Sequence, residues 1–382
     1  MPTGPRGGEV CLRLRHPEGE TPILVGAGAL AAGAALLGGW LEGRTVFVVS
    51  TPRVLGLHGA RLTPLVAPAA RRVDLEVPEG EAAKTLAVAS GLWERMLAAG
   101  GKRDSRVVAF GGGSVGDLAG FAAGCFLRGL PFAQVPTTLL AQVDAALGGK
   151  TGVDLPAGKN TVGLFHHPAA VISDTELLVT LPAEELRSGL VEVVKMGLIL
   201  DPGLFRRVEE GLPALVAGDA RALAPVVAGA AAAKAEVVES DPTERGARRL
   251  LNLGHTLGHA LESALGYRGL RHGEAVGYGL LFALRLAERR GLTGPDPGLF
   301  GRTRTLLARL DLPPLPAADL EPGDLLARMA RDKKARESGL TWVLPEVVAP
   351  GRAEGRLVAD FGAVELATEL AAFLADPYLP VL

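Results

Sequence analysis

The sequence RVVAFGGGSVGD at residues 106–117 joins a short apolar run to a glycine-rich turn. Residues 106–110 predict a buried strand, and Gly111, Gly113 and Gly116 fit the G-x-G-x-x-G spacing before an apolar helix. Such glycines let backbone N–H groups approach a pyrophosphate at the helix N-terminus. No Asp or Glu lies between Asp117 and Asp144, so the ribose-binding acid expected about 20 residues further on is missing. The turn predicts either a variant nucleotide site or a tight turn without a ligand.

Outward from this turn, the two halves of the chain differ in pattern. In the first half, apolar β-rich runs alternate with Ala- and Gly-rich helical ones, which is typical of an α/β sheet with helices on its faces. The expected elements are strands at 45–49, 73–77 and 106–110 and a helix at 84–99. From about residue 182 helical patterns dominate, at 183–200, 203–217, 220–239, 247–265, 274–290 and 299–310. We therefore predict an α/β nucleotide-binding domain at 1–178 and an all-α domain at 179–382, with 340–344 as a late edge strand.

Composition narrows the class of protein. The 382 residues are 48% hydrophobic and 21% charged, which is typical of soluble globular proteins. The formal net charge is −2 and basic residues are scattered, so neither nucleic acid nor a membrane is an expected partner. Cys11 and Cys125 have no metal or redox spacing. With no signal pattern and no apolar run long enough to span a bilayer, we expect a cytoplasmic protein.

Two glycine-flanked lysines follow the turn. Lys150 lies in GGKTG at 148–152 and Lys159 precedes Asn160, and flexible backbone, ammonium groups and an amide suit a phosphate site. The GKT triplet is not a P-loop, because Asp144 stands where that motif has its first glycine. Only eight of the 40 basic residues are lysines, so these positions are candidates for binding anions, although chance placement explains them equally well at this point.

The run RRLLNLGHTLGH at 248–259 is the polar part of the second half. If 248–262 is helical, steps of three and four residues place five polar side chains on one face. These are Arg248, Asn252, His255, His259 and Glu262.

A two-histidine, one-carboxylate zinc site is one interpretation of this region. Glu192 and Lys195 alone predict an ordinary helical ion pair, but Glu192 with His255 and His272 completes such a site. The alternative, chelation by His255 and His259 as in metalloproteases, lacks the Glu that should follow the first histidine, since this residue is Thr256.

Together these motifs resemble the 3-dehydroquinate synthase family, in register from about residue 79 to 335. The matching segments are GGGSVGDLAGF at 111–121, RG at 128, PTT at 136, GKTG at 149, GKN at 158, ExxK at 192, NLGHTLGH at 252, HGE at 272 and DKK at 332. The resemblance implies a Rossmann-like variant domain followed by a helical domain. It also implies NAD, a divalent metal, usually zinc with cobalt as an alternative, and a homodimer.

The resemblance also implies roles for individual residues. Metal ligands would be Glu192, His255 and His272. Cofactor contacts would be Glu81, Lys84, Gly112, Gly113, Asp117, Thr137, Thr138, Lys159 and Thr180. Substrate contacts would be Arg128, Lys150, Asn160, Lys234, Arg248 and Lys333, the last in preference to Lys334. Catalytic residues would be Lys195, His259, Asp144, Glu244 and Asn252.

The implied reaction is that of a carbon–oxygen lyase of the shikimate pathway, which leads to chorismate and aromatic amino acids. It converts 3-deoxy-D-arabino-heptulosonate 7-phosphate to 3-dehydroquinate and phosphate by alcohol oxidation, phosphate elimination, ketone reduction, ring opening and an intramolecular aldol. Other sugar phosphate cyclases (2-epi-5-epi-valiolone or 2-deoxy-scyllo-inosose synthase types) and glycerol dehydrogenase-type polyol dehydrogenases are the alternatives. A non-catalytic protein of this fold is disfavoured, because no matched metal ligand or lysine is missing.

One departure concerns the cofactor. Many family members have Asp-x-Asn after an early strand, whereas this chain has STPR at 50–53. Arg53 leaves NADP open as an alternative to NAD.

Overall fold

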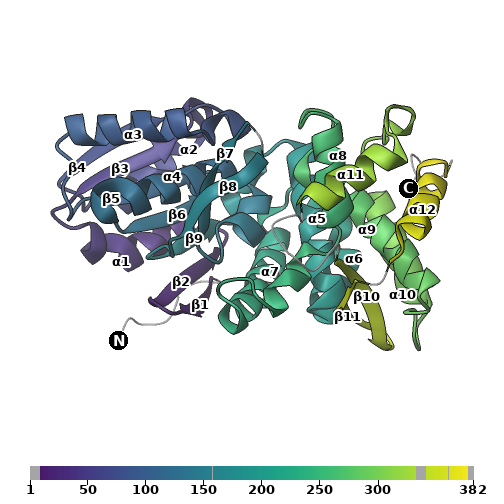
Figure 1. The fold of residues 1–382 in the computed structure, drawn as a ribbon. Helices are drawn as coiled ribbons and strands as arrows, with labels where there is room; N and C mark the ends of the chain where they lie inside the picture. Colours follow the sequence, from purple (N-terminus) through teal and green to yellow (C-terminus); the bar gives the residue numbers. More distant parts are fainter. Residues whose placement is uncertain (1–8, 157, 333–340, 360, 377–382) are drawn as a thin grey trace. The chain divides into compact units, whose positions relative to one another are not determined.

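The computed structural model describes residues 9–156, 158–332, 341–359 and 361–376, which belong to two compact units (Figure 1). The first unit spans residues 1–182 and 217–243, and the second spans 183–216 and 244–382. Helix α7 (Ala220–Ser240) thus belongs with the first unit, where Thr175 Oγ1 donates to the Ala220 carbonyl at 2.7 Å. A division into functional domains at 178/179 stays a prediction.

A seven-stranded sheet is the centre of the first unit, in the order β1-β2-β9-β6-β5-β3-β4. Its strands are β1 (Val10–His16), β2 (Gly19–Gly26), β3 (Thr45–Ser50), β4 (Arg71–Glu76), β5 (Arg106–Gly111), β6 (Phe132–Pro136) and β9 (Val171–Asp174). Only the β1–β2 pair is antiparallel among these neighbours. This sheet confirms the α/β prediction, and β7 (Lys150–Leu155) and β8 (Gly158–Phe165) form a separate hairpin.

Alternating side chains of the parallel strands enter two cores. In β3, Phe47 and Val49 pack in one core and Val46 and Val48 in the other, as expected for a strand buried on both faces. The unit's helices are α1 (Ala29–Leu41), α2 (Pro52–Val66), α3 (Leu86–Ala98) and α4 (Gly113–Cys125), besides α7. Short helical turns are η1 (Gly80–Ala83), η2 (Phe126–Arg128), the π-helical η3 (Ala141–Ala145) and η4 (Thr175–Thr180).

The second unit is a helical body with one hairpin added. Its helices are α5 (Ala183–Ile199), α6 (Pro202–Val216), α8 (His255–Ala264), α9 (His272–Arg289), α10 (Gly298–Arg309), α11 (Pro322–Asp332) and α12 (Ala363–Leu374), with turns η5 (Ala247–Asn252) and η6 (Ala317–Asp319). The expected late strand is present as β10 (Trp342–Ala349), but it pairs with β11 (Arg352–Val358) and not with the edge of the large sheet.

The continuous helix expected over 247–265 is wrong. The 3-10 turn η5 ends at Asn252, and α8 starts only at His255. Gly254 between them has φ +80°, and a Cβ there would lie 2.9 Å from the Val276 carbonyl oxygen of α9. This close approach breaks the helix, so Arg248 and Asn252 do not share a helix face with His255 and His259.

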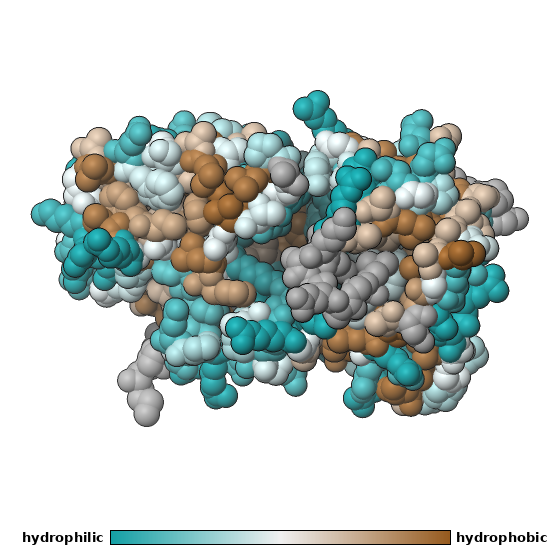
Figure 2. All heavy atoms as spheres, viewed as in Figure 1, coloured by the Kyte–Doolittle hydropathy of each residue, from teal (hydrophilic) through white to brown (hydrophobic). Residues whose placement is uncertain are grey.

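The surface carries no extended apolar belt in the view of Figure 2, where hydrophobic residues form small patches among hydrophilic ones. No described helix is both long and apolar enough to cross a bilayer.

Candidate functional site

The glycine-rich turn is built for close approach of backbone and neighbouring side chains. Strand β5 ends at Gly111, Gly112 precedes the first turn of α4, and a Cβ at Gly112 would lie 3.1 Å from Thr138 Cγ2. A Cβ at Gly116 would lie 2.7 Å from Gln134 Oε1 of β6. The third glycine therefore allows helix α4 to pack on the sheet. A helix N-terminus preceded by such a glycine turn is a position that favours an anion.

A buried lysine connects three separate segments beside this turn. Lys84 Nζ donates to Asp117 Oδ2 at 2.8 Å and to Asn160 Oδ1. Burial alone would lower the pKa of Lys84, but the carboxylates of Asp117 and Glu81 outweigh it and raise that pKa. The ammonium therefore stays charged, and predicted cofactor and substrate contacts meet at one group.

Two further predicted cofactor contacts lie at the edge of this cluster. Lys159 Nζ is 3.8 Å from Glu81 Oε2, and Ser114 Oγ donates to Glu81 Oε1 at 3.3 Å. Asn160 has φ +53°, and its backbone N–H donates to Asp154 Oδ1 at 2.6 Å. Sequence reasoning missed Ser114 and Asp154, although Ser114 lies inside the quoted glycine motif.

Asp144 and Lys234 form a second polar pair in the first unit. Lys234 Nζ of α7 contacts the Asp144 carbonyl oxygen and Oδ1, each at 2.5 Å. This contact brings together two predicted residues that are 90 positions apart in the chain.

Thr137 and Thr138, two of the predicted cofactor contacts, form hydrogen bonds with backbone groups. Thr138 Oγ1 accepts from the Ala141 N–H at 3.2 Å, and the Thr137 N–H donates to the Gly111 carbonyl at 2.9 Å.

Thr180 Oγ1 lies 2.7 Å from His58 Nε2 of α2. Burial, with the positive charge of Arg61, lowers the pKa of His58, a buried partner that no sequence motif indicated.

Of the predicted phosphate contacts, Asn160 belongs to the Lys84 cluster, and the other two are at the surface. Lys150 and Arg128 are exposed, and Arg128 has φ +70° directly after Leu127 with φ +50°. Lys333 and Lys334 lie outside the described residues.

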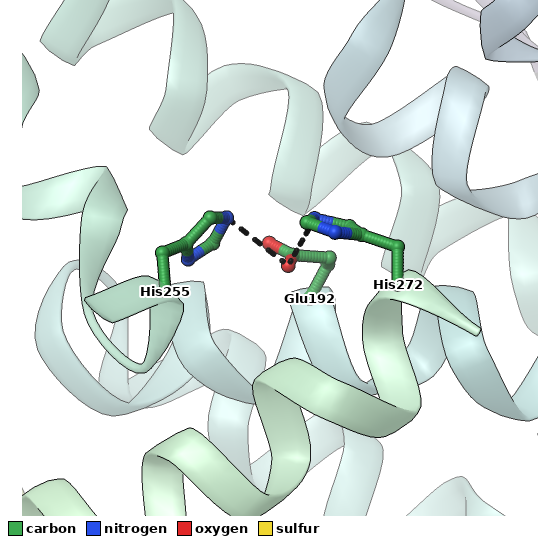
Figure 3. Close-up of side chains that lie close together, drawn as sticks. All are labelled: Glu192, His255 and His272. Carbon is green, nitrogen blue, oxygen red and sulfur yellow. Dashed lines mark ion pairs between the residues drawn. The ribbon is translucent and has the colours of Figure 1, made fainter. Parts of the chain in front are cut away.

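In the second unit, three predicted metal ligands converge from three helices (Figure 3). Glu192 of α5 is fully buried, and its Oε1 lies 3.7 Å from His255 Nε2 and 3.8 Å from His272 Nε2. The two histidines are the first residues of α8 and α9. Lys195, one turn after Glu192 and equally buried, forms an ion pair with Glu192 Oε2.

Helix packing explains why His272 reaches Glu192. A Cβ on Gly273 would lie 2.0 Å from the Ser188 carbonyl oxygen, so only glycine lets α9 start this close to α5. The Gly273 N–H also donates to Ser188 Oγ at 3.0 Å. Arg271, just before α9, pairs with Glu185 at 2.8 Å and with Glu274 at 3.2 Å.

Further predicted catalytic and substrate-binding residues lie in the same unit as this triad. His259 lies one turn after His255, with ring centroids 5.3 Å apart. Asn252 Nδ2 donates to Glu244 Oε1 at 2.9 Å, and Arg248 is buried in η5.

The triad suits a divalent metal. Zinc bonds to His nitrogen or carboxylate oxygen are about 2.0–2.2 Å long, so one ion can reach atoms less than about 4 Å apart. Within the described part of the chain, no hydrogen-bond donor reaches Glu192 Oε1 despite its complete burial. Burial, with the charges of Lys195, His272 and His259, keeps the pKa of His255 well below its ordinary value, and neutral imidazole is the form that binds metal.

Family comparisons agree with the residue pattern. The model described as 3-dehydroquinate synthase N-terminal matches residues 74–188, and that described as 3-dehydroquinate synthase C-terminal matches 189–335. A 3-dehydroquinate synthase of Symbiobacterium thermophilum is 46% identical over 336 residues, covering 87% of this chain and 93% of the relative. One of Pelotomaculum thermopropionicum is 43% identical over 341 residues, covering 89% and 91%.

Solved structures of similar fold include a 2-epi-5-epi-valiolone synthase from Streptomyces hygroscopicus with NAD+ and Zn2+ bound, at 29% identity and TM-score 0.81, covering 92% of this chain and 96% of that one. A 2-deoxy-scyllo-inosose synthase complexed with carbaglucose-6-phosphate, NAD+ and Co2+ has 26% identity and TM-score 0.81, covering 96% and 99%. The chain belongs to the 3-dehydroquinate synthase family.

Proposed function

We propose that this enzyme converts 3-deoxy-D-arabino-heptulosonate 7-phosphate to 3-dehydroquinate and phosphate, with NAD and a divalent metal, most suitably zinc. The observation that carries the proposal is the triad of Glu192, His255 and His272, whose nitrogen and oxygen atoms converge with no donor at Glu192 Oε1 among the described residues. When bound, NAD supplies reversible hydride transfer and the metal supplies Lewis-acid polarisation of a substrate oxygen.

The chain's own groups around the triad have separate tasks. Lys195 supplies a buried positive charge that favours negative charge on a reacting oxygen. His259, one turn from a metal ligand, moves a proton between substrate and solvent. Asn252, held by Glu244, binds a substrate hydroxyl. Arg248 and Lys234 are each proposed as a cationic group suited to binding a carboxylate.

Groups of the first unit bind the cofactor and the phosphate. The first turn of α4 with Gly112 and Gly113 accepts the pyrophosphate. The ion pair of Lys84 with Asp117 holds the N-terminal part of α4 in place. Donors for anionic oxygens come from Asn160, Lys150 and Lys159. The Glu81, Thr137, Thr138 and Thr180 assignments remain part of this proposal.

We also propose that the enzyme acts as a cytoplasmic homodimer in which Arg128 reaches the partner's phosphate site. Arg128 is exposed on a segment with two consecutive positive φ angles, an uncommon backbone conformation that often occurs at functional sites. Light scattering on the purified protein should give twice the chain mass, and a monomer with full activity would remove this part of the proposal.

The activity test is phosphate release from the heptulosonate phosphate with NAD and zinc present. We expect phosphate without net NADH, because the cofactor is oxidised and reduced once in each cycle. Net NADH formation would instead support a polyol dehydrogenase, and turnover of a sugar phosphate without a carboxylate would support another cyclase type.

Variants connect the activity to the triad. His272→Ala should abolish phosphate release, while Glu209→Ala, which removes an ion pair with Arg302 elsewhere in the helical unit, should retain it. Full turnover by metal-free His272→Ala protein would exclude the triad as the metal site.

A further inference from the structure

Glu262 is a buried carboxylate of α8 to which the proposed function gives no task. It is 5% exposed and lies one turn after His259 and two turns after His255, on the face of α8 that carries both histidines. Its Oε2 lies 3.2 Å from Nδ1 of His272, the first residue of α9. Burial of a carboxylate is costly unless it has a partner, and this imidazole is one.

The contact determines which nitrogen of His272 carries the proton and which carries the lone pair. A carboxylate oxygen accepts hydrogen bonds and does not donate them, so the proton of a neutral His272 ring lies on Nδ1. Nε2 then presents its lone pair toward Glu192 Oε1, 3.8 Å away. This is the nitrogen that the proposed metal site requires.

The second histidine of the triad is oriented differently. His255 Nδ1 lies 3.1 Å from the Leu253 carbonyl oxygen, a backbone group that no side-chain substitution removes. The His255 ring is therefore oriented by a backbone carbonyl in the helix break before α8. The His272 ring is oriented by a side chain.

We infer that Glu262 is a positioning residue that holds the His272 ring and its tautomer for the metal, without contacting metal or substrate itself. This inference rests on the proposed metal site. Carboxylates that accept from a ligating histidine typically change metal affinity by about 10-fold to 100-fold when they are removed. His259, Glu262 and His272 also lie close enough together to hold an ion of their own. However, a separation of 3.2 Å between Nδ1 and Oε2 is already a hydrogen-bond length.

The test measures Co2+ affinity by chelator competition, together with the visible absorption spectrum of the bound ion, on the purified full chain. Glu262→Ala should weaken binding by about 10-fold to 100-fold and alter the spectrum. Glu262→Gln keeps an oxygen acceptor and should recover most of that loss. Glu369→Ala is the matched control, because Glu369 is a partly buried carboxylate of the same unit that pairs with Arg285 and Arg289. It should bind Co2+ like the unaltered chain.

The possible failures are distinguishable. If Glu262→Ala binds Co2+ as tightly as the unaltered chain, the positioning role is wrong. If the unaltered chain binds two equivalents and Glu262→Ala one, Glu262 is a ligand of a second ion and the inference is also wrong. If the unaltered chain binds no Co2+, or His272→Ala keeps full affinity, the proposed metal site itself fails. Thermal unfolding of each variant, measured in the presence of chelator, checks that it folds. If Glu262→Ala does not fold, Glu262→Asp replaces it, because its shorter side chain moves the carboxylate away from His272.

Discussion

The Lys84 cluster of the first unit and the Glu192 triad of the second unit differ in how their charged groups are compensated. In the parallel-sheet unit, Lys84 is paired with Asp117 and Asn160, so its charge is balanced within the protein. In the helical unit, Glu192 Oε1 faces two imidazoles, and no donor among the described residues reaches it.

This difference indicates which cluster depends on a bound ion for its structure. Lys195 pairs with the other oxygen of Glu192, Oε2, but a buried carboxylate oxygen that accepts no hydrogen bond is still costly. A bound cation compensates that cost and adds binding free energy to folding. The sheet cluster has its partners before any ligand arrives. We therefore expect metal removal to affect the helical unit selectively, and loss of a paired residue to affect the sheet unit.

Metal removal should have the largest effect. Chelation should reduce phosphate release by more than about 100-fold, since loss of an orienting partner alone costs up to about that factor. It should also lower the stability of the helical unit, by about 2.7 kcal/mol when the metal had been present at 100 times its Kd. Hydrogen exchange should accelerate at the starts of α8 and α9, and added zinc should restore both properties.

The sheet unit is the internal control for this experiment. Its strands β3 and β5 should exchange at the same rate with and without metal. Equal acceleration in both units would contradict the difference between the two clusters.

Replacing Lys84 tests the other side of the comparison. Lys84→Met leaves the Asp117 carboxylate without its partner and should destabilise the protein by about 2–4 kcal/mol, because breaking a buried ion pair exposes the cost of the remaining charge. Urea unfolding measures this change. Asp117→Asn in the same chain should recover part of the loss, and Co2+ affinity of the helical unit should stay within about twofold.

Gly273→Ala should have a smaller effect that depends on packing. The new methyl group would meet the Ser188 carbonyl oxygen and push the start of α9, with His272, away from Glu192. We expect a loss of about 1–3 kcal/mol in stability and weaker Co2+ binding. Gly301→Ala in α10, where nothing lies within 4 Å of the added Cβ, is the control and should be neutral or stabilising. Unchanged Co2+ affinity in Gly273→Ala would show that this glycine does not position His272.

Local spacing predicted much of the fold and singled out candidate site residues, and ligand chemistry grouped Glu192 with His255 and His272. Other contacts between distant segments were not predictable. The strand at 106–110 and the glycine turn follow from a β-rich run and three spaced glycines, and α5 from its apolar period. The break at Gly254 depends on the neighbouring helix α9, which no local pattern records. His58 beside Thr180 and Glu262 beside His272 are contacts of the same kind, made across the fold.

Arg53 should produce the smallest effect of these substitutions, and it bears on the cofactor end of the sheet unit. Strand β3 ends at Ser50, whose Oγ donates to the Phe110 carbonyl at 2.6 Å, and Thr51 Oγ1 accepts from the Val54 N–H at 3.3 Å as a helix cap. Neither hydroxyl is the carboxylate that usually binds a ribose.

The exposed Arg53 side chain has no ion pair or hydrogen bond with any described residue. If NAD is the cofactor, Arg53→Ala should change NAD affinity by less than about twofold, measured by fluorescence titration. Tighter binding of NADP than of NAD, lost in Arg53→Ala, would instead assign this arginine to a 2′-phosphate.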